Sequence, residues 1–390
     1  MLYVTFALIL IGIPGLSRGG IVSVLFAALW LLYGVLFKQR VFPAILYLPL
    51  AFYFVIVAFG FILYEYPVEP VGKLTTAWIG GITIAAFVAN GVSLRFVVSC
   101  FFAVIVANLL AYAVGYDGRV LHVLSERDNF YHQHTEIKRF TALAGQSNLL
   151  VAFAFTFPFL LFLFKKRFGA NNLIGCTTLC VVFMFLTASR STLPFTFLYF
   201  IFGCLFFIKT PWFRAFTCAA GVVILSIFAY IILSFSVVDI LTNSFISNSE
   251  FIIRIVEALN RESGSIETRV GLATGFGRFF VEHPFMGYGP DQFKVVAGNG
   301  SYAHNNFGEL LINYGLIGSL IYYSMYLLIL IRIIEFSRSN FYLIAPLLYL
   351  IASEFVFVTH VERPLVLLLC LLLLISNHSK LTSYRYRYRL

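Results

Sequence analysis

The chain has 390 residues, of which 61% are hydrophobic and only 11% are charged. Ordinary soluble domains carry about 25% charged residues, so this composition excludes a soluble globular protein and is typical of an integral membrane protein. The formal net charge of +10 does not indicate nucleic-acid binding, because the basic residues are scattered in short groups between apolar runs.

Apolar runs that are long enough to cross a membrane recur from one end of the chain to the other. Because a spanning helix needs roughly 17–25 such residues, we expect about twelve transmembrane helices. The first run lacks the basic residues that begin a signal peptide, so we expect it to remain as a helix. The expected fold class is all-α, a polytopic membrane protein in which residues 1–390 form a single integral membrane domain. The expected spans are 2–16, 20–37, 41–64, 74–93, 96–114, 149–164, 173–188, 192–208, 216–238, 307–331, 342–360 and 364–377.

The basic residues in the short loops predict the orientation of these helices. If the N-terminus is cytoplasmic, the inside segments hold fourteen Lys and Arg residues and the short outside loops hold four. The positive-inside rule therefore predicts that both termini are cytoplasmic. Two long loops, 115–148 and 239–306, then lie outside, and we expect short amphipathic helices along the membrane surface in the second of them.

Two arginines near the outer ends of predicted helices are candidates for binding an anion. Residues 268–281 have helical spacing, and Arg269 lies on the apolar side of that helix. A guanidinium is costly there unless it meets an anion. Arg190 follows the apolar run of the seventh span, and two interpretations stay open for it: it extends to the lipid headgroups, or it joins Arg269 at a binding site.

A histidine lies where the second long loop returns to an apolar helix. Asn306 and Glu309 have the spacing of a capping box, which predicts a helix start at 305–307. His304 is then at the positive end of the helix dipole, which favours the neutral, basic form of its imidazole. A lone histidine at an interface is often structural, but the fixed helix start and the nearby arginines favour a catalytic role. Small residues and one leucine recur at three- and four-residue spacing, which predicts close helix packing at Gly308, Leu311, Gly315 and Gly318.

Three segments together resemble a known family. HNNFGELLINYGLIG has a histidine and an asparagine, then nine residues, then Gly-x-x-Gly, at His304, Asn305, Gly315 and Gly318. Upstream, ETRVGLATGFGRFFVEHPFMGYGPDQF is similar to an arginine-bearing helix followed by a Pro-x-x-Gly-x-Gly turn, and RFTALAGQSNLLVAF (139–153) is similar to the segment ahead of the sixth span. These segments resemble the O-antigen ligase/polymerase superfamily of bacterial lipopolysaccharide assembly, and the histidine motif is closest to its ligase branch.

The resemblance implies a glycosyltransferase of the bacterial inner membrane with its active site in the periplasm. Such a ligase moves O-antigen polysaccharide from undecaprenyl pyrophosphate to a sugar hydroxyl of lipid A-core, with inversion at the anomeric carbon. His304 would be the general base, and Arg190 and Arg269 would hold the donor pyrophosphate. Supporting roles are expected for Asn305, Arg139, Tyr302, Gly315 and Gly318. The four aspartates form no Asp-x-Asp pair, so we expect transfer without a metal and without a cofactor.

Two other functions stay open. An O-antigen polymerase uses the same donor with a second carrier-linked glycan as the acceptor, and the sequence barely separates it from a ligase. A twelve-span transporter is the alternative from another class, because Glu354 is an acid within the eleventh expected span and could relay protons. Glu354 could instead pair with a basic residue of the site or form a hydrogen bond to a neighbouring helix.

Overall fold

The computed structural model describes residues 43–63, 68–90, 92–113, 147–164, 170–187, 192–208, 277–297, 302–303, 305–336 and 340–377, with a few isolated positions between 210 and 219. Within these ranges every regular element is helical. The predicted all-α class is therefore confirmed for the part of the chain that the structure describes.

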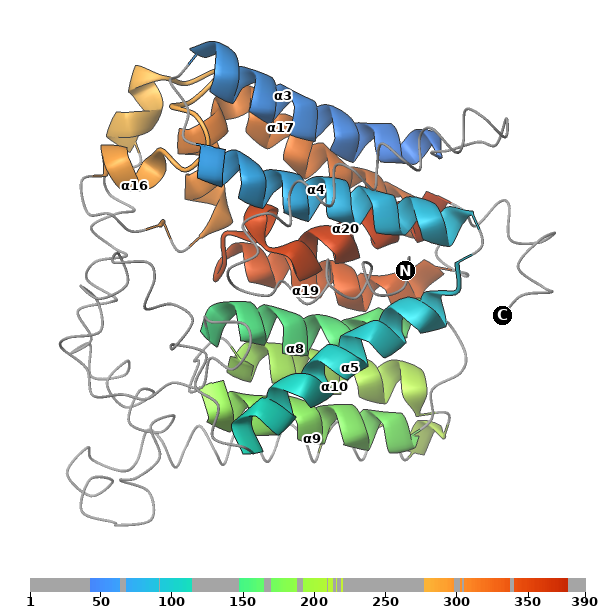
Figure 1. Cartoon of the computed structure of the whole chain (residues 1–390). Coiled ribbons are helices and arrows are strands. Elements are labelled where there is room, and N and C mark those ends of the chain that lie inside the picture. The colour runs from blue at the N-terminus through green and yellow to red at the C-terminus, as the bar shows by residue number, and fades with distance from the viewer. Residues whose placement is uncertain are drawn as a thin grey trace. The chain divides into compact units, whose positions relative to one another are not determined.

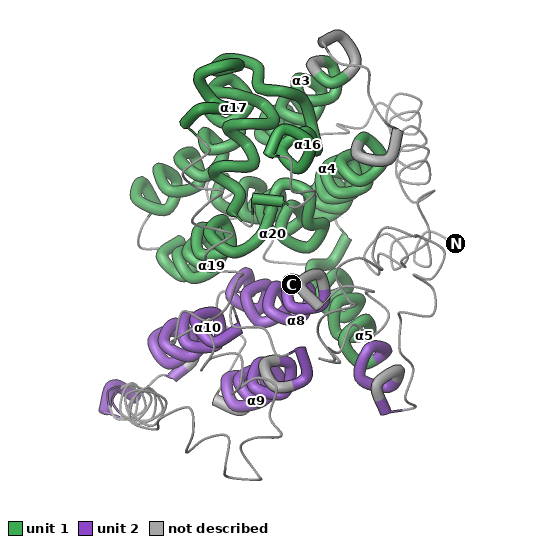
Figure 2. The backbone as a smooth tube through the Cα atoms, turned by 90° about the vertical axis from the view of Figure 1, so that its left-hand side faces the viewer, with its two compact units in different colours: residues 1–106, 271–390 green, residues 107–270 purple. Residues whose placement is uncertain are grey.

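The chain contacts divide the protein into two compact units (Figure 2). Unit 1 comprises residues 1–106 and 271–390, and unit 2 comprises residues 107–270. The division falls within α5 (Leu94–Ala113). Unit 1 therefore joins the first part of the chain to the last.

Unit 1 is a bundle of apolar helices in which α20 (Arg363–Asn377) lies at the centre of the packing. It packs against α4 (Val68–Ala89), α17 (Asn306–Glu335) and α19 (Ile344–Glu354), while α3 (Tyr47–Leu63) packs against α4 and α17 (Figure 1). Nearly every side chain of α20 is buried, including a continuous run of leucines. A helix that is apolar on all sides is stable where lipid or other helices cover it, and here other helices do so.

An aromatic cluster joins three of these helices. The ring of Phe52 on α3 lies 4.7 Å from that of Trp78 on α4 and 5.4 Å from that of Tyr322 on α17, measured between centroids. The Trp78 indole also donates a 2.8 Å hydrogen bond to the carbonyl oxygen of His360. Because this bond links α4 to the short segment before α20, it fixes the position of that segment in the bundle.

In the described part of unit 2, three helices pack against one another: α8 (Ser147–Leu161, continued by the 3-10 turn Phe162–Phe164), α9 (Ala170–Thr187) and α10 (Thr192–Phe207). Aromatic side chains fill the space between α8 and α10. Tyr199 makes edge-to-face contacts with Phe159 and Phe162, each at 5.8 Å between ring centroids. Ring packing thus contributes to the contact between α8 and α10.

Two helices of the described residues are long and apolar enough to cross a membrane, namely Val71–Ala89 and Asn306–Glu335, and several shorter apolar helices accompany them. Most of the predicted spans between 41 and 377 coincide with observed helices to within a few residues. The predicted spans 2–16 and 20–37, and nearly all of 216–238, lie outside the described residues. The count of twelve transmembrane helices and the extents of the two long loops therefore stay predictions.

Two predicted helix boundaries were wrong. The helix expected at 74–93 begins at Val68, because its polar first turn with Glu69 and Lys73 was excluded by the apolarity criterion. The span expected at 342–360 ends as an α-helix at Glu354 and continues through a turn into a 3-10 helix, η5 (Thr359–Val361). This turn brings Thr359 and His360 back toward α17, where their side chains form hydrogen bonds.

A break in α17 is filled by the turn at residues 284–289. In a regular helix the N–H groups of Leu316 and Ile317 would bond to the carbonyls four residues earlier, at Ile312 and Asn313. Instead, these N–H groups donate to the carbonyls of Pro284 (2.8 Å) and Phe285 (3.1 Å) in the turn. The two vacated helix carbonyls accept from the N–H groups of Tyr288 and Gly289, both at 2.8 Å. The turn thus replaces the missing helix bonds.

Glycines make this contact possible. Gly315 has φ 61° and ψ −162°, a conformation that is essentially restricted to glycine, and a Cβ there would lie 2.3 Å from the carbonyl carbon of Phe285. Gly287 has φ 69°, and a Cβ there would lie 2.5 Å from the Ile312 carbonyl oxygen. The prediction that Gly315 and Gly318 allow close packing of another helix was wrong: Gly315 faces the backbone of the turn, and Gly318 faces Tyr314 of its own helix.

Replacing Gly315 with alanine is expected to lower the thermal unfolding midpoint of the purified protein markedly. The strained backbone alone costs about 1–3 kcal/mol, and the clash with Phe285 must also separate the turn from α17. The matched control is Gly277→Ala, because Gly277 is helical and no atom lies within 4 Å of the position of its added Cβ. The control should be neutral or stabilising by up to about 1 kcal/mol. Equal unfolding midpoints for the two variants would contradict this account of the break.

Candidate functional site

The residues predicted from the sequence fall into two groups. His304, Arg190, Arg269 and Arg139 lie outside the described residues. Tyr302, Asn305, Gly315 and Gly318 are described, and all four lie at or near the first turns of α17. The structure therefore describes the chain neighbours of position 304 on both sides.

Asn305 caps the helix that follows the candidate base. Its side-chain oxygen accepts a 2.7 Å hydrogen bond from the N–H of Gly308, and α17 begins at Asn306. The predicted helix start is confirmed, but the predicted capping box of Asn306 with Glu309 was wrong by one position. Asn306 is fully buried and bonds elsewhere, so the cap falls on the preceding asparagine, whose extended backbone suits that position.

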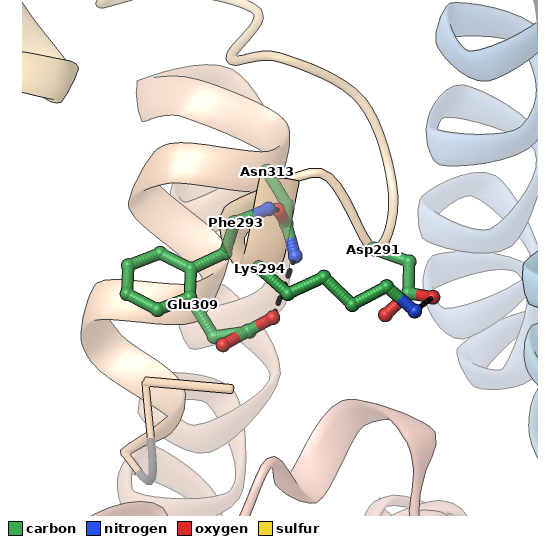
Figure 3. A network of polar contacts seen from close by, with 5 residues as sticks. All are labelled: Asp291, Phe293, Lys294, Glu309 and Asn313. Carbon is green, nitrogen blue, oxygen red and sulfur yellow. Dashed lines mark hydrogen bonds and ion pairs between the residues drawn. The ribbon is translucent and has the colours of Figure 1, made fainter. Parts of the chain in front are cut away.

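Glu309 and Asn313 fix the segment on the other side of the candidate base (Figure 3). One carboxylate oxygen of Glu309 accepts from the N–H of Ala303 at 2.8 Å, and the other accepts from the Asn313 amide at 3.1 Å. The Asn313 oxygen accepts in turn from the N–H of Phe293 at 2.8 Å, at the start of α16 (Phe293–Val296). Ala303 and Asn305, the two neighbours of His304, are thus both tied to the first turns of α17.

Tyr302 is held by a charged pair in the same loop. Asp291 adopts φ 61°, which is uncommon for a residue other than glycine, and pairs with Lys294 (Figure 3). The Lys294 ammonium lies 5.7 Å from the centre of the Tyr302 ring. Burial, and then the charge of Asp291, raise the pKa of Tyr302, so its hydroxyl stays protonated and can donate.

A small cavity lies among these residues within unit 1. Its volume of about 30 Å³ is enough for a water molecule, and it is lined by charged and polar groups together with apolar ones. Tyr302, Asp291 and Glu309 line one part of it, and Lys73 of α4 and His360 of η5 line another. The first turns of α4 and α17 therefore lie at the same end of the unit as Pro290, Asp291 and Tyr302.

A buried polar cluster behind the start of α17 was not found from the sequence. The carboxylate of Glu354 accepts hydrogen bonds from five side chains: Asn306, Tyr322, Tyr323, Tyr326 and Thr359. Glu354 is the last residue of α19, at the turn that leads into η5. The alternative that it bonds to a neighbouring helix is confirmed. The sequence did hold one indication of this cluster. Tyr322 and Tyr323 lie four and three residues before Tyr326, so the three hydroxyls share one face of α17.

The cluster is linked to the aromatic core through His360. The oxygen of the Asn306 side chain accepts from the backbone N–H of His360 at 3.3 Å and lies 2.6 Å from Nδ1 of its ring. Nε2 of the same ring lies 3.3 Å from the hydroxyl of Tyr314. Because the Asn306 amide nitrogen is directed at Glu354, its oxygen faces His360, so Nδ1 carries the proton and Nε2 accepts from Tyr314.

Comparison with known protein families gives a match. A family model described as O-antigen ligase matches residues 175–323. This match confirms the resemblance found in the sequence. The matched range contains Arg190, Arg269, His304 and both glycines of the Gly-x-x-Gly motif. No curated protein matches the chain.

Proposed function

We propose that this protein transfers O-antigen polysaccharide from undecaprenyl pyrophosphate to a sugar hydroxyl of lipid A-core at the periplasmic face of the inner membrane. The family match supports an O-antigen ligase or a polymerase-like function in general. The observation that carries the proposal further is the double attachment around His304. Ala303 is bonded to Glu309, and Asn305 is bonded to Gly308, so both chain neighbours of the proposed base are attached to the first turn of α17.

The proposed reaction is a single displacement at the anomeric carbon of the donor sugar. The acceptor hydroxyl oxygen attacks that carbon while His304 accepts the hydroxyl proton, and the bond from the carbon to the pyrophosphate oxygen breaks. The products are the core-linked glycan, with inverted anomeric configuration, and undecaprenyl pyrophosphate. Negative charge develops on the leaving group, and the guanidinium groups of Arg190 and Arg269 stabilise it through paired hydrogen bonds.

We propose that this chemistry needs no metal ion. Among the described residues, no group of three or more His, Cys, Asp or Glu side chains is arranged to hold one. The four aspartates form no Asp-x-Asp pair, which supports stabilisation of the leaving group by cationic side chains. Both proposed substrates carry lipid anchors, so the reaction would take place at the membrane surface.

The lipopolysaccharide of a strain that lacks this protein tests the choice between ligase and polymerase. Loss of a ligase should leave lipid A-core without O-antigen and polymer retained on the carrier. Loss of a polymerase should instead leave core that bears a single repeat unit. The first pattern, restored by expression of the full-length chain, is the expected result, and the second would replace our proposal with the polymerase.

The structure weakens the argument for a transporter. Its best support was Glu354 as a proton relay within the membrane, but this carboxylate is surrounded by five hydrogen-bond donors and lies at the end of a helix. Such an arrangement suits a structural anchor better than a group that binds and releases protons. Proton-driven uptake by vesicles that contain the protein would revive the transporter.

A further inference from the structure

The environment of Glu354 is unusual for a buried acid. Its side chain is almost completely buried, yet the donors that surround it are all neutral side chains. Three of them are tyrosines of α17, one is Thr359 in η5, and one is Asn306 in the first turn of α17. The carboxylate therefore joins α19, α17 and the segment before α20 at a single point.

Asn306 connects this point to the candidate base. Its amide nitrogen donates to Glu354 at 2.6 Å, and its oxygen accepts from the backbone N–H of His360. An amide group has one donating and one accepting end, so the carboxylate sets which end faces which partner. Asn306 is fully buried and lies two residues after His304 in the chain. A rotation of this amide would break bonds on both sides and loosen the first turn of α17.

A purely stabilising role does not explain why an acid stands at this position. A buried polar network is not more stable than well-packed apolar side chains of the same volume, because each group loses its hydration. Such a network does impose one arrangement, since any other leaves donors or acceptors unsatisfied. The benefit is therefore geometric, and the geometry that it imposes is that of the helix start at Asn305 and Asn306, which directly follows His304 in the chain.

We propose that Glu354 is a positioning residue for glycan transfer, which acts through Asn306 to hold the start of α17 in the orientation that the base requires. This inference rests on the proposed function. Glu354 touches no substrate and no reacting atom. Its removal from the network should lower turnover while leaving donor binding intact, because the arginines proposed to bind the donor are on other segments of the chain.

The test exchanges the donor and the acceptor of the Asn306–Glu354 pair in the full-length protein. Asn306→Asp places a second carboxylate against Glu354, so turnover should fall about 100-fold, the loss that a misplacement of about 1 Å can cause. Adding Glu354→Gln to Asn306→Asp restores one donor and one acceptor and should recover turnover to within about tenfold of wild type, since the tyrosine and threonine hydroxyls can rotate to accept from the new amide. Retention of carrier-linked donor should be the same in all three proteins.

A matched control and a milder variant complete the experiment. Ser353→Ala, next to Glu354, removes a buried hydroxyl that bonds only within its own helix, to the Tyr349 carbonyl, and it should keep wild-type turnover. If Asn306→Asp fails to insert or unfolds, Asn306→Ala removes the amide without adding charge and should show the same loss of turnover with donor retention preserved. Thermal unfolding midpoints are measured for every variant.

The outcomes separate this inference from the proposed function. Absence of transfer by the wild-type protein contradicts the proposed function itself. If wild type is active, wild-type turnover in Asn306→Ala, or a double variant as slow as Asn306→Asp alone, overturns the positioning role. A parallel loss of donor retention and turnover would also overturn it, because Glu354 would then support the whole site and not the position of the base.

Discussion

Replacing Arg190 or Arg269 with lysine is expected to abolish glycan transfer, although each change preserves the positive charge. A guanidinium group presents two parallel N–H groups to one phosphate, whereas an ammonium group acts as a single point charge. A diphosphate can occupy two such groups, one from each arginine. The loss should therefore appear in donor retention as well as in turnover.

Arg278→Lys is the control for this experiment. The Arg278 side chain is 83% exposed, and its Nε atom lies 3.8 Å from Oε1 of Glu282. Such a surface ion pair contributes little to the free energy of unfolding. This variant should transfer glycan at the wild-type rate. Near-normal transfer by both Arg190→Lys and Arg269→Lys would contradict the assignment of these arginines to the pyrophosphate.

Replacing His304 with alanine is expected to slow transfer by about 10²–10⁴-fold, the usual contribution of a general base. Donor retention should be largely unchanged, since in our account the histidine contacts the acceptor hydroxyl and not the pyrophosphate. The wild-type rate should fall as the pH is lowered from 8 toward 5, because a protonated imidazole cannot act as a base. The residual rate of the alanine variant should lack this dependence.

Comparison of donor retention and turnover across this pH range separates a base from a binding residue. If His304→Ala loses donor affinity as severely as Arg269→Ala, the histidine binds the donor and the division of roles between the arginines and the histidine is wrong. Tyr302 provides no alternative base in this range, because burial and Asp291 keep its hydroxyl protonated.

Most helix positions could be predicted from the sequence because they depend on local composition. Runs of apolar residues long enough to span a membrane correspond to α3, α5, α8, α9, α10, α17 and α20 within a few residues. The start of α17 was also predicted, because capping depends on a few adjacent residues. The cap itself was misassigned because two asparagines stand side by side, and only the structure shows that Asn306 is drawn away by Glu354 and His360.

Contacts between segments that are distant in the chain could not be predicted, because no local sequence pattern indicates them. The turn at 284–289 and the break near Gly315 were each visible as glycine-containing motifs, but their mutual hydrogen bonds were not. The partners of Glu354 were missed for the same reason, since they lie 5 to 48 positions away in the chain. In an apolar chain such bonds decide where a helix breaks and which way an amide faces, and these details shape the candidate site.

Reconstituted transfer by the purified full-length chain tests the central claim most directly. Proteoliposomes would contain the protein, undecaprenyl pyrophosphate-linked O-antigen and lipid A-core, with and without EDTA. We predict that core-linked glycan accumulates as the carrier-linked donor disappears, at the same rate in both conditions, and that His304→Ala suppresses it. The account would be contradicted if the donor stayed on the carrier although folded protein and lipid A-core were present. It would also be contradicted if glycan were transferred only to a second carrier-linked glycan.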